Sequence, residues 1–494
     1  MNKNVVLISF YNPKQIGVKY LEAALKKSGY NPTIIAIKKY NSKHLNDITA
    51  KEINLLKELI RKINPIFVGF SVMSSFNLET VKKVQQAVKE CGFLTIWGGV
   101  LVTLIPKKAF ENGADYVISG EGEEAIVQFA DSIASGNSPD NLPNIIYYKE
   151  NKLIKNELLP LKETADEYGL PEACNNNRIL IDNNRIIYKD QNLNSYGYEI
   201  SATRGCPFSC SYCSSVNLRR LYTGQKYVKF RSVENLMSEL NDAKKHIKKL
   251  RFIHFWDEIF PDDKSWIDEF TSRYKNGIGL PFEIWGHPLK IKEYTIMKLV
   301  EAGLFEITVG IQSGSEYIRR DIFNRYETEQ QILKASKILQ SCGVPNIVYD
   351  FMLRHPFETL EDLKKSYELC MKLYPPFSLQ LHGLGFLPGT DICQIAIDKK
   401  IYSEEELNGI MFGNSDTIYK NFWGNINNNE EINFWYNLIY LTQFNGYRNK
   451  TKLYSSDFEK YKILVTNNVK AASKIEKFNY YLKKSKIYFS MIKQ

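Results

Sequence analysis

Three cysteines lie close together in the sequence, at a spacing suited to holding a metal centre. Cys206, Cys210 and Cys213 follow the pattern Cys-x3-Cys-x2-Cys, so their thiolates can converge from a single loop. A 4Fe–4S cluster is normally held by four cysteines, and no fourth cysteine lies nearby in the sequence. Three ligands would leave one iron open, much as a catalytic zinc site keeps one position for substrate. The spacing by itself predicts a site with three thiolates.

The stretch from Arg204 to Cys213 resembles the signature of the radical S-adenosylmethionine superfamily. This resemblance implies a 4Fe–4S cluster whose open iron is chelated by the amino and carboxylate groups of S-adenosylmethionine. It also implies reductive cleavage of that molecule to a 5′-deoxyadenosyl radical. The alternative is a structural zinc site, which would usually need a fourth Cys or His at close range. His254 is remote in the sequence.

Composition places the chain among ordinary globular proteins. Its 494 residues are enough for two or three domains, and 44% hydrophobic and 24% charged residues are typical contents. No apolar run reaches the ~18 residues of a membrane span, and Val5–Ile8 is too short for the core of a secretory signal. Eight cysteines, three of them clustered, do not indicate a disulfide framework in a chain of this length. We therefore expect a cytoplasmic protein.

Residues 1–135 alternate apolar runs with helical patterns, which predicts a parallel, doubly wound sheet of the Rossmann-like class. The expected strands are Val5–Ser9, Pro32–Ile37, Ile66–Ser71, Leu94–Trp97 and Tyr116–Ile118. The expected helices include Ile16–Ser28, Ala50–Lys62 and Leu78–Cys91. Such sheets bind ligands at the carboxyl ends of their strands. The loops there are rich in small or polar residues, although a flavodoxin-like or receiver domain would show a similar pattern.

Because this region precedes the tri-cysteine segment, it resembles the cobalamin-binding domain of cobalamin-dependent radical S-adenosylmethionine enzymes. The matching segments are Gly69–Met73, Gly98-Gly99 followed by Pro106, and Asp115–Glu123. The resemblance implies a cobalamin cofactor, and the alternative is a degenerate, purely structural domain. The candidate cobalamin contacts are Asn12, Ser71, Met73, Ser74, Gly98, Gly99, Gly120, Glu121 and Gly122.

Lys14 stands where many cobalamin proteins carry the histidine that binds cobalt. A cationic lysine is a poor cobalt ligand. We therefore expect a base-off cobalamin without histidine ligation.

Residues 195–400 again alternate strands and helices, and six β/α units predict a partial barrel with active groups at the carboxyl ends of its strands. The expected strands are Gly197–Thr203, Lys249–Trp256, Phe282–Gly286, Glu306–Ile311, Ile347–Leu353 and Leu379–Gly385. Cys206, Cys210 and Cys213 follow the first of these strands, as this geometry requires.

The resemblance also implies contacts to S-adenosylmethionine within the barrel. Asp257 and Glu258 occupy the place of an acidic segment that contacts the methionyl amino group; favourable charge at a helix start is the alternative. The segment from Gly310 to Glu316 resembles one that lines the ribose and carboxylate of the ligand. Its candidate contacts are Gln312, Ser313 and Ser315, and Ser315 is also suited to helix capping.

Three further side chains near these segments have open roles. Arg320 or Arg325 could pair with the methionyl carboxylate through a planar guanidinium. His355 is either an acid/base group beside the substrate or a packed loop histidine. The sequence assigns no catalytic side chain.

The remaining segments are a linking region at 136–194 with one hairpin, and a mainly helical region at 401–494. From Tyr447 to Gln494, 12 Lys/Arg and 3 Asp/Glu give a charge of +9 (12 − 3). Nucleic acid, another anionic polymer or an acidic membrane surface could bind such a tail. A solvated lysine face whose aromatic residues pack inward is the alternative.

Together these features predict a cobalamin-dependent radical S-adenosylmethionine enzyme, with C-methylation of a biosynthetic substrate as the favoured reaction. A non-methylating enzyme of cyclisation, ring contraction or oxidation is one alternative. A cofactor-bearing sensor without turnover is another. The expected partners are a small-molecule or peptide substrate and an electron donor such as flavodoxin or ferredoxin.

Overall fold

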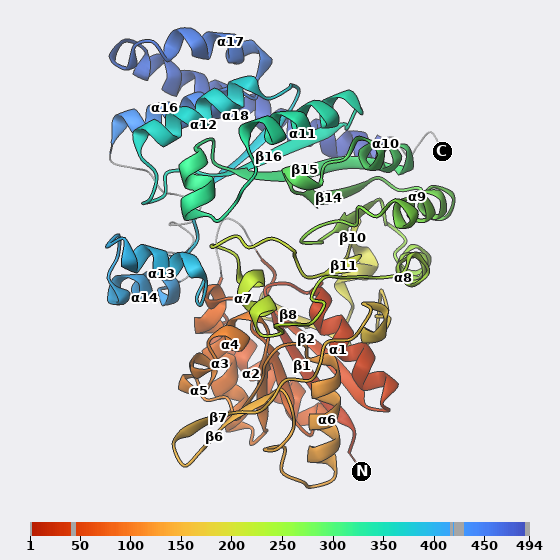
Figure 1. Cartoon of the computed structure of the whole chain (residues 1–494). Helices are drawn as coiled ribbons and strands as arrows, with labels where there is room; N and C mark the ends of the chain where they lie inside the picture. The colour runs from red at the N-terminus through yellow and green to blue at the C-terminus, as the bar shows by residue number, and fades with distance from the viewer. Residues whose placement is uncertain (1, 41–45, 415–417, 419–428, 490–494) are drawn as a thin grey trace.

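The computed structural model describes residues 2–40, 46–414, 418 and 429–489, and contains two parallel sheets (Figure 1). In Figure 1 the first sheet and its helices lie at the end that carries the N-terminus, and the second sheet lies at the other end. Helix α7 (Ser214–Arg220) lies between them.

The first sheet is doubly wound, as predicted. Its parallel strands are β1 (Asn4–Phe10), β2 (Asn31–Ile37), β3 (Val68–Ser71), β4 (Thr95–Gly98) and β5 (Tyr116–Ile118). The helices between them are α1 (Ile16–Lys27), α2 (Ala50–Ile63), α3 (Leu78–Glu90), α4 (Val100–Leu104), α5 (Lys107–Glu111) and α6 (Glu123–Ala134).

Alternate side chains of β1 show why this strand is an unbroken apolar run. Val6 and Ile8 pack in one buried cluster with α2 and α3, whereas Val5 and Leu7 pack in another with α1 and α6. Both faces of the sheet are therefore covered by helices, which is typical of parallel sheets.

Residues 136–194 do not form a separate linker, because four of their strands extend this sheet. These strands are β6 (Ile145–Lys149), β7 (Lys152–Lys155), β8 (Arg178–Asp182) and β9 (Arg185–Ile187). The full order is β7-β6-β5-β4-β3-β1-β2-β8-β9. The predicted hairpin is β6–β7, and β8 pairs in parallel with β2. The linker assignment was wrong because short edge strands separated by polar loops resemble connecting segments.

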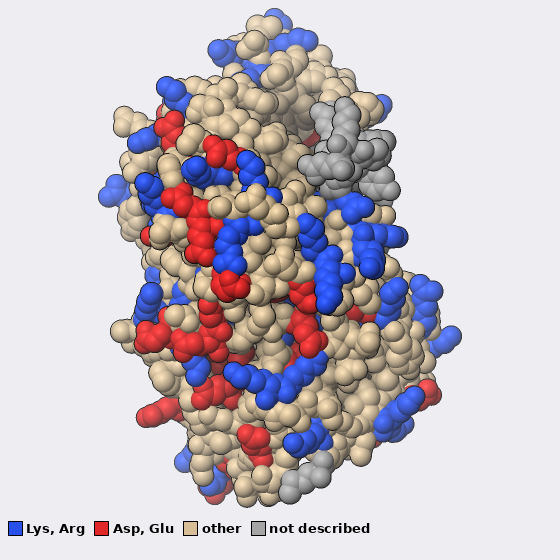
Figure 2. Space-filling model, turned by 90° about the vertical axis from the view of Figure 1, so that its right-hand side faces the viewer, with Lys and Arg blue, Asp and Glu red and all other residues tan. Residues whose placement is uncertain are grey.

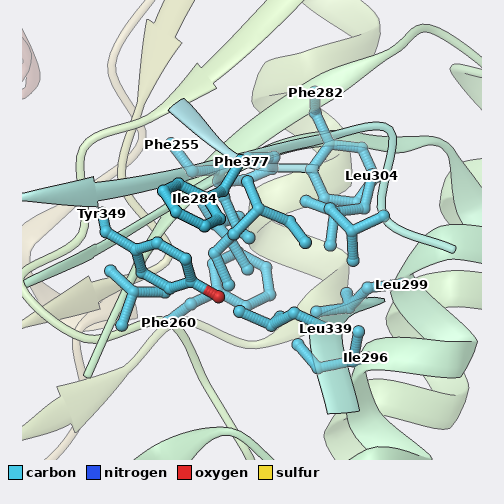
Figure 3. Packing of buried hydrophobic residues seen from close by; sticks show 14 of the residues in the cluster. Phe255, Phe260, Phe282, Ile284, Ile296, Leu299, Leu304, Leu339, Tyr349 and Phe377 are labelled. Carbon is cyan, nitrogen blue, oxygen red and sulfur yellow. The ribbon is translucent and has the colours of Figure 1, made fainter. Parts of the chain in front are cut away.

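The second sheet contains six parallel strands and confirms the partial barrel. In spatial order they are β10 (Gly197–Ile200), β13 (Phe252–Phe255), β14 (Phe282–Gly286), β15 (Leu304–Gln312), β16 (Asn346–Met352) and β17 (Ser378–His382). The covering helices are α8 (Val233–His246), α9 (Lys264–Gly277), α10 (Glu293–Ala302), α11 (Glu329–Ser341) and α12 (Leu360–Lys372). Figure 3 shows Phe255, Phe282 and Leu304 of the strands packing near Leu299 and Ile296 of α10 in the core.

The C-terminal region is mainly helical, as predicted. It contains α13 (Asp391–Asp398), α14 (Glu404–Phe412), α16 (Glu430–Leu441), α17 (Asn445–Tyr454) and α18 (Phe458–Phe489). Phe434 and Trp435 of α16 are buried in the same core as the barrel. None of the helices described here is both long enough and apolar enough to cross a membrane.

At the upper end of the face shown in Figure 2, where Figure 1 places α17, most of the surface is uncharged and the charged side chains that show are basic. Phe458 and Tyr461 pack against the core, whereas Phe478 is exposed. The aromatic residues of the basic segment therefore divide between core and surface. Its binding of an anionic partner stays a prediction.

Candidate functional site

The loop that carries the three cysteines is pinned to the barrel by hydrogen bonds. The Ser211 amide and hydroxyl donate to the carbonyls of Phe323 and Ile322, at 3.0 and 2.6 Å. Asn324 donates to the Ser209 carbonyl at 2.7 Å, and Arg219 donates to the Cys206 carbonyl at 3.0 Å. The loop is therefore held in place by segments on both sides of it.

The three thiols lie in a shielded environment. Cys210 is buried, and Cys206 and Cys213 are partly buried. Burial raises the pKa of Cys206 to about 12 and that of Cys213 to about 11, and the Glu258 carboxylate adds to both shifts. Iron binding requires the thiolate forms, so cluster binding must displace the protons that burial favours on Cys206 and Cys213.

The donor set fits an iron–sulfur cluster better than zinc. Within the described part of the chain, no group of three or more His, Cys, Asp or Glu side chains is arranged to hold a metal ion. In a 4Fe–4S cluster each thiolate binds a different iron, so the three sulfurs need not meet at one ion. The Arg325 guanidinium lies 3.7 Å from Cys210 Sγ and supplies positive charge beside it. Ligation by Cys206, Cys210 and Cys213 stays a prediction that this environment supports.

A cavity of about 460 Å³, the central cavity, lies between the cysteine loop, the barrel strands and the first domain. Its barrel residues include Gln312 of β15, Asp350 and Met352 of β16, and His382 of β17. The lining is completed by Tyr40, Ser74, Ser75, Phe76, Tyr212, Leu384, Gly385, Phe386, Leu387, Ile410 and Ile418. Both domains and the cysteine loop thus meet around one space.

Gln312 faces this cavity from a strained backbone. Its φ is +71°, a left-handed value that non-glycine residues rarely adopt. The side chain is buried, and its Oε1 atom has no hydrogen-bond partner. A buried unpaired acceptor is unfavourable unless a ligand satisfies it. Gln312 therefore fits the expected contact with a hydroxyl or ammonium group of S-adenosylmethionine.

Asp257 and Glu258 are neighbours with different environments. Asp257 is 3% exposed, and its Oδ1 accepts from Ser201 Oγ, the amides of Ala202 and Thr203, and Thr203 Oγ1. Asp257 therefore fixes the turn before β11 (Thr203–Arg204). Glu258 is exposed and accepts from Ser215 Oγ at 2.8 Å. Of the two, Glu258 is the better placed to contact a ligand amino group.

The hydroxyls of Ser313 and Ser315 are used inside the protein. Both residues are fully buried. Ser315 Oγ donates to Asp362 at 2.6 Å, and Ser313 Oγ accepts from the Ser315 amide at 3.1 Å. These bonds shape the loop after β15, and the expected ligand contacts of the two serines stay predictions.

The structure separates the two candidate arginines. Arg320 is exposed and lies 3.7 Å from Glu316. Arg325 is buried and donates to Glu327, to the Gly310 carbonyl and to Tyr212. Arg325 is therefore the one that lies beside the cysteine loop.

His355 is a packed loop histidine. It is 3% exposed, it packs near Phe323 and Phe357, and burial lowers its pKa to about 3. It does not line the central cavity, so the acid/base alternative is not supported.

At the carboxyl ends of the first sheet lies a second cavity of about 270 Å³, the sheet-end cavity. It extends between the sheet and helices α1 and α6, where Ile16, Leu21, Ile96 and Ile126 line it. Seven of the candidate cobalamin residues line it: Ser71, Met73, Gly98, Gly99, Gly120, Glu121 and Gly122.

Its glycines serve two purposes. A Cβ at Gly98 would meet nothing closer than Ile118 Cβ at 4.0 Å, so this glycine leaves room for a ligand. A Cβ at Gly99 would lie 2.6 Å from the Val72 carbonyl oxygen, and one at Gly120 would lie 2.0 Å from Tyr222 Oη. Those two glycines are required by the protein's own packing.

The other two candidates, Asn12 and Ser74, line an adjoining cavity of about 230 Å³. Two unpaired buried acceptors, Gln15 Oε1 and Asn77 Oδ1, belong to residues that line the same space. The corrin ring of cobalamin carries primary amides at its edge, and these donate hydrogen bonds. The two sheet-end spaces therefore fit cobalamin, and Gln15 and Asn77 join the candidate contacts. The sequence offered no signal for either, because both belong to common surface residue types.

Lys14 points toward the barrel. Its Nζ donates to Ser195 Oγ at 2.5 Å. Among the described residues that line the two sheet-end cavities, there is neither a histidine nor a cysteine. This composition supports the base-off prediction.

Arg204 connects the two ends of the site. It lies two residues before Cys206, and its guanidinium donates to Glu121 at 2.7 Å and to Glu123 at 2.5 Å. The rings of Tyr20 and Tyr168 lie 4.5 and 4.1 Å from it. The Gly120–Glu123 loop of the first domain is thus tied directly to the cysteine loop.

Comparison with known proteins matches two parts of the chain to protein families. A B12 binding domain matches residues 4–130, and the radical SAM superfamily matches residues 200–370. The chain is 26% identical over 361 residues to an uncharacterized methyltransferase of Pyrococcus horikoshii, covering 71% of this chain and 73% of that protein. It is 23% identical over 387 residues to the anaerobic magnesium-protoporphyrin IX monomethyl ester cyclase of Cereibacter sphaeroides, covering 72% and 56%.

A solved structure shares the fold. The radical S-adenosylmethionine methyltransferase TsrM of Kitasatospora setae, with cobalamin and a [4Fe–4S] cluster bound, superposes with a TM-score of 0.62 at 16% identity. The match covers 80% of this chain and 76% of that one. The two matched domains together span residues 4–130 and 200–370, more than half of the sequence. The chain therefore belongs to the cobalamin-dependent radical S-adenosylmethionine enzymes, whose cofactors are a 4Fe–4S cluster, S-adenosylmethionine and cobalamin.

Proposed function

We propose that this protein is a C-methyltransferase that acts on an unactivated carbon of a biosynthetic substrate. The observation that carries the proposal is the central cavity, because the cysteine loop, the barrel strands and the first domain all contribute to its wall. A substrate held there would lie between the cluster end and the cobalamin end of the protein.

The residues that would hold each group follow from the site. Cys206, Cys210 and Cys213 would hold the cluster, Gln312 and Glu258 would contact S-adenosylmethionine, and the residues lining the sheet-end cavities would hold cobalamin. When bound, these groups supply one-electron cleavage of S-adenosylmethionine and a transferable methyl group. The protein's own contribution is to orient the reactants and to exclude water from the cavity.

The cavity wall favours a largely apolar substrate without anionic groups. Phe76, Met352, Leu384, Phe386 and Leu387 line it, and none of the described lining residues is a Lys or Arg. Its ionisable pair, Asp350 and His382, is paired internally. A phosphate or carboxylate buried in this space would find no Lys or Arg side chain among these residues to pair with, which is unfavourable.

Anaerobic turnover tests the proposal. Protein reconstituted with iron, sulfide and cobalamin is incubated with S-adenosylmethionine, a reductant and candidate apolar substrates, and products are read by mass spectrometry. We expect 5′-deoxyadenosine and a product heavier by one methylene. Reduced flavodoxin or ferredoxin should replace the chemical reductant. Cys210→Ala should abolish the cluster's visible absorption and reduce both products to background, whereas Cys91→Ala, at the end of α3, should leave them unchanged.

The second candidate is a non-methylating cyclase or oxidase, favoured by the similarity to a magnesium-protoporphyrin IX monomethyl ester cyclase. A product without the added methylene, formed together with 5′-deoxyadenosine, would support this candidate. Absence of 5′-deoxyadenosine from cluster-loaded protein would instead support a sensor without turnover.

A further inference from the structure

Helix α18 carries apolar side chains on two different sides. One side is buried in the barrel core through Val465 and Ala472, where α18 packs against α16. The other side is exposed and presents Ile463, Leu464, Ile475 and Phe478. Of these, Ile463 is 73% exposed and Phe478 is 63% exposed. The exposed set is not part of the core cluster that buries Val465.

The four exposed side chains form one stripe, the outer face of α18. At 3.6 residues per turn, Ile463, Ile475 and Phe478 lie within about 120° of one another around the helix axis, and Leu464 lies between them. Val465 and Ala472 lie on a different side of the helix, about 120° or more from Phe478. Single apolar residues are common at protein surfaces, whereas a continuous stripe indicates a contact with a protein or a membrane.

The outer face is also positively charged. Helix α18 contains eight Lys and two Glu, which gives a net charge of +6 (8 − 2). Both of its glutamates are engaged by protein groups. Tyr440 Oη donates to Glu476 at 2.6 Å, and Glu459 lies 3.0 Å from Lys462 Nζ. Three of the lysines are exposed beside the stripe: Lys470, Lys474 and Lys477.

We propose that the outer face of α18 docks the protein on a bilayer that contains anionic phospholipid. A helix lies in the plane of a membrane surface when its large apolar residues form one stripe and its lysines flank that stripe. In this arrangement Ile463 and Phe478 enter the boundary of the acyl chains. The lysine ammonium groups reach the headgroup phosphates on their flexible stems.

The chemistry of the outer face favours a bilayer over other occupants. A second copy of this chain would bring the same net positive charge against it, which is unfavourable. Nucleic acid would pair with the lysines but would leave Ile463 and Ile475 in water. A bilayer with anionic headgroups satisfies both the positive charge and the apolar stripe.

Docking would bring the protein to the place where apolar molecules collect. The central cavity favours an apolar substrate, and such a substrate partitions into a bilayer. This consequence rests on the proposed function, whereas the docking itself follows from α18 alone.

Vesicle sedimentation tests the inference with full-length, cluster-loaded protein under anaerobic conditions. We expect vesicles of phosphatidylcholine mixed with phosphatidylglycerol to bind the protein about 10-fold or more tightly than vesicles of phosphatidylcholine alone. High salt should reduce this preference, because it screens the lysines from the headgroups.

Two double variants separate the charge from the apolar stripe. Lys474→Gln/Lys477→Gln should weaken binding to the mixed vesicles about 10-fold or more. Its matched control is Lys334→Gln/Lys337→Gln, which removes two exposed lysines at the same spacing on α11 and should leave binding unchanged. Ile475→Ser/Phe478→Ser should also weaken binding about 10-fold or more, because the apolar side chains no longer leave water. Met297→Ser, at an exposed position of α10, is the control for this change.

Circular dichroism and the cluster's visible absorption check that each variant is folded. Equal binding to the two kinds of vesicle, or unchanged binding by Ile475→Ser/Phe478→Ser, would overturn the inference. Tighter binding to RNA or duplex DNA than to vesicles, lost only in the lysine variant, would overturn it in favour of nucleic acid. A dimer in light scattering that Ile475→Ser/Phe478→Ser dissociates would assign the outer face to a second copy instead.

Vesicle binding is measured without turnover, so the docking and the proposed function fail separately. A protein that binds the mixed vesicles in this way but methylates nothing would refute the proposed function and leave the docking standing. A methyltransferase that ignores vesicles would do the reverse.

Discussion

At the scale of single residues, the same side-chain chemistry serves structure or ligand according to its surroundings. Asp257 and Glu258 are adjacent acids after one strand, yet Asp257 is buried with four donors on Oδ1 and none on Oδ2. Glu258 is exposed beside the cysteine loop. Sequence reasoning assigned both to the ligand, and an acidic type at a strand end does not reveal how many protein donors fold back onto it. The ligand contact of Asp257 stays a prediction, for which only its unpaired Oδ2 is left.

Asp257 should make the protein's stability depend on pH. Burial raises its folded-state pKa to about 6, above the value of about 4 in an unfolded chain. The raised pKa means that its contribution to stability is fully present below about pH 4 and is lost as the pH rises through 6. We expect the unfolding free energy of wild type minus that of Asp257→Asn to fall by roughly 3 kcal/mol between about pH 4 and pH 7. Urea unfolding of metal-free protein measures this difference.

Asp263→Asn is the matched control for this prediction. Asp263 is an exposed N-cap of α9, and hydrogen bonds from Ser265 and Trp266 lower its pKa. The unfolding free energy of wild type minus that of Asp263→Asn should therefore rise with pH, whereas the corresponding difference for Asp257→Asn should fall. A pH-independent difference for Asp257→Asn would contradict the assignment of a raised pKa.

At the scale of elements, the site is built where loops from distant parts of the chain meet. The cysteine spacing was readable because its ligands come from one loop, and the strands were readable from their apolar periodicity. The sequence did not identify four further residues that line the cavities, because which side chains line a cavity depends on which segments become neighbours in the fold. They are Gln15, Asn77, Asp350 and His382. The Arg204 bridge was missed for the same reason, since its partners lie more than 80 residues earlier in the sequence.

Arg204 should contribute measurably to stability through its ion pairs between the cysteine loop and the first domain. Arg204→Met should lower the unfolding free energy by about 2 kcal/mol, because it leaves the partly buried Glu121 and Glu123 without their cation. It should also weaken cobalamin binding, since the Gly120–Glu123 loop loses its anchor. Arg204→Lys should retain only part of the stability and of the cobalamin affinity, because an ammonium group cannot pair with two carboxylates as a planar guanidinium does.

Urea unfolding and spectroscopic titration with cobalamin measure these effects. The comparison variant is Arg220→Met, which removes an exposed arginine paired with Asp391 and should cost less than about 1 kcal/mol. Equal effects of the two substitutions would show that the Arg204 bridge does not couple the two loops.

At the scale of the whole molecule, the predicted order of a cobalamin-binding sheet, a barrel and a helical region describes the chain well, but the boundaries are shared. Strands β8 and β9 return to the first sheet after a long excursion. There Arg178 of β8 donates to Glu22 of α1 at 2.6 Å and to Asp190 at 3.0 Å. A domain boundary predicted from composition alone could not include β8 and β9 in the first domain. An edge strand can be assigned to a sheet only when the strand that it pairs with is known.

This shared sheet predicts which fragments can fold. A fragment of residues 1–135 ends before β6–β9, so it exposes both edges of the sheet and leaves Glu22 buried without Arg178. A fragment of residues 1–190 keeps all nine strands and both partners of Arg178. We expect the longer fragment to unfold cooperatively and, although it lacks Arg204, to retain more cobalamin through gel filtration than the shorter one. The shorter one should aggregate or melt without a transition, because unpaired edges and a buried unpaired charge both destabilise it. Circular dichroism melting and the visible absorption of bound cobalamin measure the two outcomes. Equal stability and cobalamin retention in the two fragments would mean that the five strands β1–β5 fold and bind cobalamin without β6–β9.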